Sequence, residues 1–401
     1  MEDSVYELLM PSRVIYGKGA FQEVGKQTKI LGKKALIISD PIMEKVGIVE
    51  DCECLFQTAN ILYSKYLGVD TEPTDIHVKD AMKVCSDEGC DVIVAIGGGS
   101  CIDTAKAVAV LMTNGGTVAD YFGTQKKFEK KPLPLIAAPT TAGTGSEVTK
   151  VTVITDTKTD VKMMIASSEL LPEVAIVDPN LTLTCPRNVT AATGIDALSH
   201  AIEAFISKKA HPVTDTLALS AIEKIMLYLR RAYNDGQDME ARDKLALGSM
   251  LAGAAFSNAS VALVHGMSRP IGALFHVPHG ISNAMLLPVV LEFTKDHTLE
   301  RLAVIGRQII PESKDKTTKE LADCVIHEIK KLCLELNIPN MKTYGLDQKR
   351  FKRVLSKMAH DAISSGSPAN NPVVPTHEEI INLYEMCYDY NFNVELNMST
   401  Q

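Results

Sequence analysis

The pattern of apolar residues changes near residue 186, and this change constrains the fold more than any other feature of the chain. Between residues 33 and 180, short apolar runs typical of strands alternate with stretches of helical spacing. The strand candidates are "KALIISD" (34–40), "DVIVAIGGGS" (91–100), "LPLIAAP" (133–139), "EVAIVDP" (173–179) and a hairpin in "VTVITDTKTDVKMMIAS" (151–167). Strands that alternate with helices predict a mostly parallel sheet with helices on its faces.

After Pro186, helical periodicity dominates and few strand signals remain. We therefore expect an α/β domain over residues 1–186 and an all-helical domain over residues 187–401, which suits a chain of 401 residues. The predicted helices span residues 188–207, 213–235, 238–268, 281–296, 298–310, 317–336, 347–363 and 377–389.

Charge and composition exclude several classes of protein. A net charge of −8 argues against a broad nucleic-acid surface, which needs clustered positive charge. The nine cysteines are dispersed, form no C-x-x-C pair and follow an acidic N-terminus without a signal-peptide pattern, so we expect reduced thiols in the cytoplasm.

One uncharged run, from Leu245 to Ser268, is long enough to span a bilayer. It is rich in Ala, Ser, Gly and Asn and lacks flanking aromatic residues. These features favour a helix buried in a bundle, and we expect no contact with a membrane.

A glycine loop follows the strand candidate that begins at residue 91. Gly97, Gly98, Gly99 and Ser100 lie between this strand and a helix. Glycines allow close approach of a pyrophosphate, and the N-terminus of the helix offers free N–H groups. The loop does not match G-x-G-x-x-G, so a plain tight turn is the alternative.

Asp40 ends another strand. A carboxylate at such a place can bind a ribose 2′-hydroxyl and favour NAD over NADP. It precedes the glycine loop, opposite to the usual order, so the spacing does not link the two, and a turn residue before Pro41 is the alternative.

The loop "PTTAGTGSEVT" (139–149) is a second candidate for contact with phosphate or ribose, against a plain Ser/Thr/Gly loop. Lys162 on the predicted hairpin is a third, against a solvated surface lysine.

Four residues of the helical half form a set of metal-ligand types. Asp196 and His200 are four residues apart and share one helix face. With His265 and His279 they give an Asp-His-His-His set that suits Fe²⁺ or Zn²⁺ better than Mg²⁺ or Ca²⁺. Buried core histidines are the alternative.

Several long motifs occur in order: "AIGGGSCIDTAKA", "PTTAGTGSEVT", "TGIDALSHAIEAF" and "VHGMSRPIGALFHVPHGISNAMLLP". With them the chain resembles the iron-containing (group III) alcohol dehydrogenases over nearly its whole length. The resemblance implies a Rossmann-like α/β domain plus an all-α domain, as in dehydroquinate synthase, with the active site in the cleft. It also implies a homo-oligomer, a dimer or larger.

The resemblance assigns roles to individual residues. It implies that the metal, Fe²⁺ or alternatively Zn²⁺, is held by Asp196, His200, His265 and His279. The positions that match the family's NAD(H) site are Asp40, Gly97, Gly98, Gly99, Ser100, Asp103, Thr140, Thr141, Thr144 and Lys162. The implied reaction is hydride transfer between NAD(H) and a short alcohol or aldehyde.

The chain departs from the family's pattern at two places. Glu72 stands where members often carry Asn. Arg269 stands where many members have a histidine proposed to relay protons, and a guanidinium cannot act as a neutral base.

We expect Arg269 to lie one helical turn from His265 and to bind a carboxylate, sulfonate or phosphonate of the substrate. The alternative is a structural salt bridge, for example with Glu203, in an enzyme for simple alcohols or diols. His276 in the same segment is a candidate proton relay, against a packing histidine. A glycerol dehydrogenase or a dehydroquinate synthase-like lyase fits the motifs less well.

Overall fold

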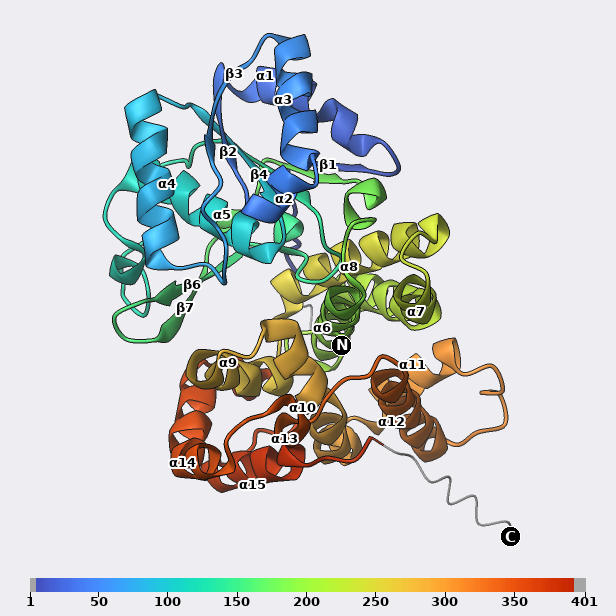
Figure 1. Cartoon of the computed structure of the whole chain (residues 1–401). Coiled ribbons are helices and arrows are strands. Elements are labelled where there is room, and N and C mark those ends of the chain that lie inside the picture. Colours follow the sequence, from blue (N-terminus) through green and yellow to red (C-terminus); the bar gives the residue numbers. More distant parts are fainter. Residues whose placement is uncertain (1–4, 393–401) are drawn as a thin grey trace.

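The computed structural model describes residues 5–392, and Figure 1 shows two lobes, an α/β lobe above and a helical lobe below. This architecture confirms the predicted fold class.

A six-stranded sheet forms the centre of the α/β lobe. Its strand order is β1-β8-β5-β4-β2-β3, and every neighbouring pair is parallel. The two edge strands, β1 and β3, were not predicted from the sequence, because they are only partly buried and lack a continuous apolar run. The strands are β1 (Arg13–Tyr16), β2 (Lys34–Ile38), β3 (Leu62–Tyr66), β4 (Val92–Gly97), β5 (Leu135–Pro139) and β8 (Val174–Val177).

Alternate residues of the central strands build two hydrophobic cores, because successive side chains of a strand point to opposite faces. In β2, Leu36 and Ile38 pack with α4 (Asp75–Glu88) and α5 (Gly99–Asn114). On the other face, Ala35 and Ile37 of β2 pack with helices that include α1 (Val24–Leu31) and α3 (Ile48–Ala59). The short α2 (Pro41–Lys45) follows β2.

The predicted hairpin is confirmed. Strands β6 (Val151–Asp156) and β7 (Val161–Ala166) are antiparallel and form a separate two-stranded sheet. In Figure 1 this hairpin lies at the lower edge of the α/β lobe, above α9, and contacts between β7 and α9 bring the two lobes together there.

The helical lobe has one continuous core, and most of its helices end within two residues of the predicted spans. The helices are α6 (Arg187–Ile206), α7 (Pro212–Asn234), α8 (Met239–Ala259), α9 (Leu263–Phe275), α10 (His279–Thr294), α11 (Leu299–Ile309), α12 (Thr318–Glu335), α13 (Met341–Tyr344), α14 (Gln348–Ser364) and α15 (His377–Tyr388).

The single helix predicted for residues 238–268 is wrong. The first helix ends at Ala259, Ser260 has a φ of 66°, and the next helix, α9, is bent by 102° relative to α8. The polar groups freed at the break find partners far away in sequence: Asn370 Nδ2 donates to Ser260 Oγ at 3.0 Å and to Val261 O at 3.1 Å, and Ser207 Oγ donates to Ala259 O at 2.6 Å. Because these partners satisfy the backbone, the helix can end within an uncharged run.

Among the described residues, no single helix is long and apolar enough to span a membrane, and the bent pair α8–α9 passes only by length and composition.

Candidate active site

The glycine loop connects β4 to α5 at the carboxyl edge of the sheet. Gly97 has a φ of 150°, and a Cβ there would lie 2.5 Å from Cys101 Sγ. A Cβ on Gly99 would lie 2.6 Å from Thr144 Cγ2. The N-cap residue of α5 is Gly98, which has no side chain to cap the helix, and among the described residues no hydrogen bond engages the N–H groups of Gly99 and Ser100, so these two can bind an anionic phosphate.

Asp40 lies beside this loop, because β2 and β4 are neighbours in the sheet. One carboxylate oxygen accepts hydrogen bonds from the backbone N–H groups of Ile42 and Met43, at 2.8 and 3.0 Å. The other lies 3.6 Å from Cys101 Sγ in the first turn of α5. The structure thus brings together two features that the spacing of the sequence could not connect.

The loop at 139–149 lies against the glycine loop. The N–H of Thr140 donates to Gly97 O at 3.0 Å. Thr141 faces Gly98, with its Oγ1 3.7 Å from a Cβ placed there, and Thr144 faces Gly99. The predicted cofactor residues from these two loops therefore lie next to one another.

Asp103, on α5, connects the loop at 139–149 to the hairpin by hydrogen bonds. Its carboxylate accepts hydrogen bonds from Ser146 Oγ at 2.5 Å and from the N–H of Val153 at 2.8 Å. Burial raises its pKa, although the charge of Lys106 opposes the shift. Both oxygens bind the protein, which makes Asp103 a support for the loops.

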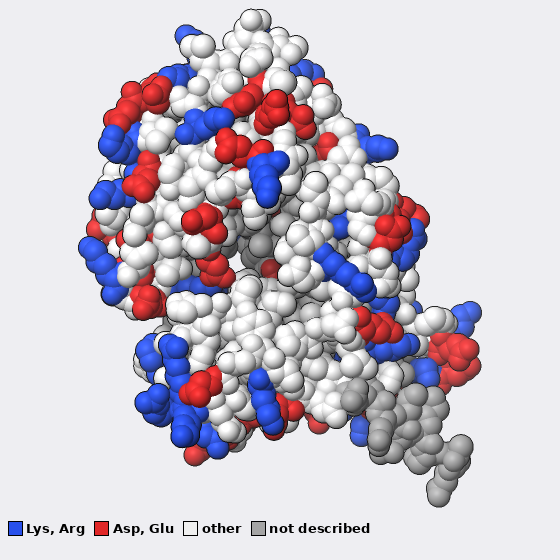
Figure 2. Space-filling model, in the orientation of Figure 1, with Lys and Arg blue, Asp and Glu red and all other residues white. Residues whose placement is uncertain are grey.

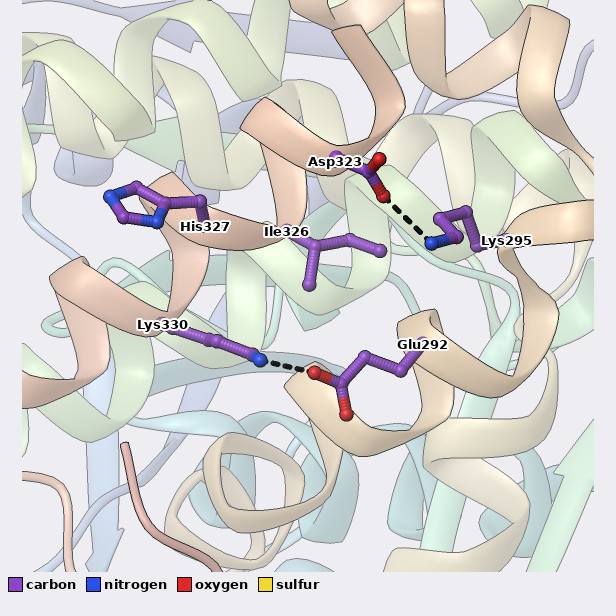
Figure 3. A pocket seen from close by; sticks show the side chains of 6 residues that line it. All are labelled: Glu292, Lys295, Asp323, Ile326, His327 and Lys330. Carbon is purple, nitrogen blue, oxygen red and sulfur yellow. Dashed lines mark hydrogen bonds and ion pairs between the residues drawn. The ribbon is translucent and has the colours of Figure 1, made fainter. Parts of the chain in front are cut away.

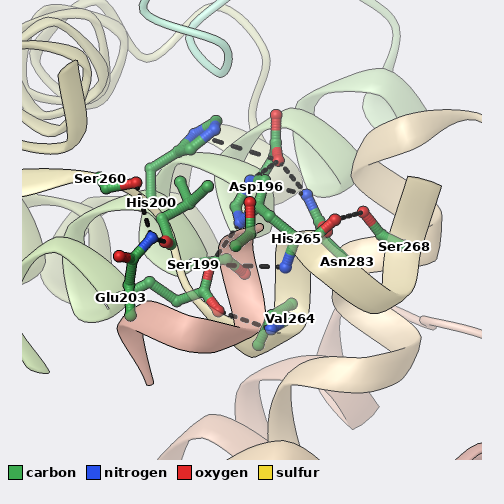
Figure 4. Close-up of polar contacts among 12 residues, drawn as sticks. Asp196, Ser199, His200, Glu203, Ser260, Val264, His265, Ser268 and Asn283 are labelled. Carbon is green, nitrogen blue, oxygen red and sulfur yellow. Dashed lines mark hydrogen bonds and ion pairs between the residues drawn. The ribbon is translucent and has the colours of Figure 1, made fainter. Parts of the chain in front are cut away.

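The four predicted metal ligands converge from three helices of the helical lobe. Asp196 and His200 lie on α6, His265 lies on α9 and His279 begins α10. One ligand atom of each lies within 4.8 Å of the others. Asp196 Oδ1 is 3.6 Å from His265 Nε2 and 3.7 Å from His279 Nε2, and Figure 4 labels Asp196, His200 and His265 of this cluster.

The electrostatics of this cluster keep the carboxylate charged and two imidazoles neutral. Burial alone would raise the pKa of Asp196, but the three imidazoles around the carboxylate, His265 among them as a hydrogen-bond partner, hold it well below its usual range. Burial lowers the pKa of His200 to about 3 and that of His279 well below its usual value. Neutral imidazoles have the free lone pair that a metal requires.

Two residues outside the predicted set complete the cluster. Glu203 Oε2 lies 2.6 Å from His265 Nδ1, and Glu203 Oε1 accepts from the N–H of Val264 at 2.5 Å. Although burial opposes it, the charge of Glu203 raises the pKa of His265. Asn283 donates from Nδ2 to Asp196 Oδ1 at 2.6 Å.

A helical-spacing rule could have found both residues, because Glu203 lies two turns after Asp196 and Asn283 one turn after His279.

The donor set fits a divalent ion. His200 Nδ1 is buried and has no hydrogen-bond partner in the described part of the chain, and a buried polar atom in that state needs an explanation. One carboxylate and three imidazoles suit Fe²⁺ or Zn²⁺. A metal bound by the cluster would account for their convergence in the core of the lobe.

Arg269 lies on α9, one turn after His265, as expected. Its guanidinium donates to Ser367 Oγ at 2.9 Å, in the short helix η7 (Ser367–Asn370), and to Met164 Sδ at 3.1 Å, on β7. Among the described residues it makes no ion pair within 4 Å, and Glu203 is engaged elsewhere. The salt bridge to Glu203 is therefore not formed.

Lys162 and His276 lie on either side of this region. The side chain of Lys162 is 9% exposed and pairs with Glu72, and its Nζ would lie 2.8 Å from a Cβ on Gly272 of α9, so it is not a solvated surface lysine. His276 ends α9 with a φ of 54° and is exposed, so it does not pack in the core. No described hydrogen bond or ring contact joins His276 to the metal cluster.

Figure 2 shows a hollow between the two lobes. β7 and α9 face each other across the junction of the lobes, with Arg269 bound to Met164 from one to the other.

A separate pocket of about 210 Å³ lies between α10 and α12 (Figure 3). Its charges are paired with each other: Lys295 with Asp323 at 2.7 Å, and Lys330 with Glu292. Glu292 lies 13 residues after His279 on α10, which places the two backbone positions about 20 Å apart. This pocket is therefore distinct from the metal cluster.

Comparison with known proteins agrees with this geometry. The family model described as "Iron-containing alcohol dehydrogenase" matches residues 11–179, and "Fe-containing alcohol dehydrogenase family, C-terminal" matches residues 190–388. Alcohol dehydrogenase 4 of Schizosaccharomyces pombe is 39% identical over 92% of this chain and 86% of its own length.

Two solved structures are similar over nearly the whole chain. A 1,3-propanediol oxidoreductase has a TM-score of 0.92 and 36% identity, covering 96% of this chain and 100% of its own. A sulfoacetaldehyde reductase from Bifidobacterium kashiwanohense, solved in complex with NAD⁺, has a TM-score of 0.85 and 29% identity, covering 97% of this chain and 100% of its own.

Proposed function

The chain belongs to the iron-containing alcohol dehydrogenase family, and on this premise we propose that it transfers a hydride between NAD(H) and a short alcohol or aldehyde that carries an anionic group. In the oxidative direction, an alcohol and NAD⁺ give an aldehyde, NADH and a proton. The anionic group would be a carboxylate, a sulfonate or a phosphonate.

The observation that carries the anionic part of the proposal is Arg269. Its guanidinium is half-buried, bonds only to a hydroxyl and a thioether among the described residues, and has no carboxylate partner. Burial lowers its pKa to about 10, against an opposing charge from Glu203, so it stays protonated at neutral pH. A cation that is partly withdrawn from water without a counter-ion has a free-energy cost, and an incoming anion would supply a bidentate partner.

Arg269 also lies near the proposed reacting centre. It is one turn from His265, and its charge contributes, behind burial and His265, to the low pKa of His200. An anion bound there would hold the other end of a short substrate close to the metal ligands. The similar sulfoacetaldehyde reductase is named for a sulfonate substrate, which supports this substrate class.

The chain's own residues would position the reactants. A divalent ion on Asp196, His200, His265 and His279 would lower the pKa of the alcohol hydroxyl, and NAD⁺ would accept the hydride. The free N–H groups at the start of α5 would bind the pyrophosphate, and Asp40 would accept from the adenosine ribose and repel a 2′-phosphate. The predicted contacts of Ser100, Asp103, Thr140, Thr141, Thr144 and Lys162 with the cofactor belong to the same proposal.

His276 is the proposed route for the hydroxyl proton. It is exposed between the two metal-ligand histidines of the segment, so its ring can exchange protons with solvent. A His276→Ala variant should lose activity most at low pH in the oxidative direction, where proton release is hardest. An unchanged pH profile would remove this role.

Substrate selectivity in an Arg269→Ala variant tests the anionic proposal. Oxidation of 3-hydroxypropionate or 2-hydroxyethanesulfonate is compared with oxidation of 1-propanol. We expect kcat/KM to fall about 100-fold for the anions, because two charge-assisted hydrogen bonds are lost at about 1.5 kcal/mol each. The value for 1-propanol should stay nearly constant.

Arg301→Ala is the matched control, because Arg301 is ion-paired with Asp215 and stacks on Phe205 in the helical lobe. Equal losses on both substrates in Arg269→Ala would contradict the proposal and favour a simple alcohol or diol dehydrogenase. Net formation of NADH separates either dehydrogenase from a dehydroquinate synthase-like lyase.

The identity of the metal is proposed as Fe²⁺, with Zn²⁺ as the alternative. The family description names iron, and the donor set accepts both ions. Metal analysis of anaerobically purified protein, with activity after reloading each ion, distinguishes them.

Two further proposals concern the protein's surroundings. All nine cysteines are free thiols, which supports a reducing location such as the cytoplasm. Within residues 5–392 the strand β1 pairs on one side only, which leaves a sheet edge available in a homo-oligomer. Light scattering in solution measures the oligomeric state, and a monomer would contradict the second proposal.

A further inference from the structure

The side-chain amide of Asn283 touches three of the four candidate metal ligands. Asn283 lies on α10, one turn after His279, and is fully buried. Its Nδ2 is 2.6 Å from Asp196 Oδ1 and 3.1 Å from His265 Nε2 (Figure 4), and 3.2 Å from His279 Nε2. A primary amide has two hydrogens: one N–H donates to Asp196, and the second is directed at the two ring nitrogens, whose lone pairs a bound metal would occupy, so the bond to Asp196 is the one that would persist with metal.

These three distances fix the place of the amide. An atom about 3 Å from three ligand atoms lies over the face that these atoms define. This face points into the helical lobe, because Asn283 is fully buried and the side chains of Asp196 and His265 are 2% and 3% exposed. The side chain of His279 is 32% exposed, so the accessible side of the cluster lies there.

The amide oxygen strengthens the case for a positioning role. Asn283 Oδ1 is buried and has no hydrogen-bond partner in the described part of the chain. Leaving a buried acceptor unpaired has a free-energy cost of about 1–3 kcal/mol. The amide nitrogen faces the ligands although its oxygen gains nothing, which indicates that the ligand contacts determine its orientation.

We propose that Asn283 is a positioning residue for the metal: it orients the carboxylate of Asp196 and closes the inner face of the donor set, so that a substrate oxygen approaches only from the side of His279. The proposal rests on the metal site put forward above. Hydrogen bonds to metal ligands fix their orientation, and filling one face excludes water from that side.

Two substitutions separate the two parts of the role. Asn283→Leu keeps a side chain of similar size, so the face stays closed while the hydrogen bond to Asp196 is lost. Asn283→Ala removes both the hydrogen bond and the atoms that close the face. Asn371→Ala is the matched control: Asn371 is also fully buried, donates to Thr294 Oγ1 at 3.0 Å and has an unpaired Oδ1, but contacts none of the metal ligands.

The experiment uses the full chain, first freed of metal and then titrated with Co²⁺. Binding is measured by competition with a chelator, and the visible d–d spectrum reports the coordination number. We expect both Asn283 variants to bind Co²⁺ 10- to 100-fold more weakly than the wild type, the usual effect of removing a partner of a metal ligand. The spectrum of Asn283→Ala should weaken through an added water, and that of Asn283→Leu should keep its intensity.

Other outcomes overturn the inference or its premise. Wild-type affinity and an unchanged spectrum in both variants would refute the positioning role, as would a loss of stability alone, like that expected for Asn371→Ala. If circular dichroism shows that Asn283→Leu does not fold, the affinity and spectrum of Asn283→Ala decide alone. Failure of the wild type to bind Co²⁺ would instead refute the proposed metal site.

Discussion

Removal of the Glu203 carboxylate should lower both the free energy of unfolding of the protein and its affinity for metal. Glu203 is 1% exposed and accepts from His265 Nδ1 at 2.6 Å and from the N–H of Val264 at 2.5 Å. The first bond fixes the ring so that Nε2 points at the metal cluster. The second satisfies a free N–H in the first turn of α9. One side chain thus joins the start of α9 to α6.

The size of the effect follows from these two bonds. A buried hydrogen bond to a charged group contributes about 1.5–3 kcal/mol, so Glu203→Ala should lower the free energy of unfolding of the metal-free protein by about 3–5 kcal/mol. Glu203→Gln keeps one oxygen as acceptor for one of the two donors, and should lower it by about half as much. Metal affinity should fall about 10- to 100-fold in both variants.

Chemical denaturation of the metal-free protein and competitive metal titration measure the two effects. Asp178→Ala is a suitable control: Asp178 is also buried and accepts from two backbone N–H groups, those of Phe21 and Asn180, both at 3.0 Å, but it lies in the α/β lobe. The Asp178→Ala variant should be less stable than the wild type and keep the wild-type affinity for metal. If Glu203→Ala also keeps its metal affinity, the carboxylate does not orient His265 and the reasoning is refuted.

Three more outcomes are expected. Gly99→Ala should weaken NADH binding at least tenfold in a fluorescence titration and lower the free energy of unfolding by about 1–3 kcal/mol, because its Cβ would lie 2.6 Å from Thr144 Cγ2. Unchanged NADH binding would place the cofactor elsewhere. Burial raises the pKa of Glu147 to about 7 from 4.5, so the folded protein holds a proton that the unfolded chain has lost between these values. Stability should therefore fall by about 3 kcal/mol as pH rises through this window, and Glu147→Gln should abolish that part of the fall in denaturation curves. Removal of metal by a chelator should lower the free energy of unfolding by about 2.7 kcal/mol if the ion was present at 100 times its dissociation constant. An equal loss of stability on adding the chelator to an Asp196→Asn variant would contradict the assigned ligands.

Local patterns in the sequence were sufficient to predict the central strands and most of the helices. The buried strand β4 is a continuous apolar run that ends in glycines, and the amphipathic helices repeat their apolar residues every three to four positions. The edge strands β1 and β3 were missed because half-exposed strands of four or five residues carry little signal. The break between α8 and α9 was missed because Asn370, Ser207 and Glu203, which bind the polar groups there, lie far away in sequence.

For the site, the sequence identified the residue types, but it did not show that these residues lie close together in the fold. Asp196 and His200 share a helix face by spacing alone, and the motifs that carry the family resemblance selected His265 and His279 with them. Only the fold decided that Asp40 lies beside the glycine loop, because strand order is set by packing of the whole sheet and not by chain order. Only the fold showed that Arg269 bonds to Ser367 and Met164 and not to Glu203, because burial and partners depend on which helices and strands face each other across the lobes.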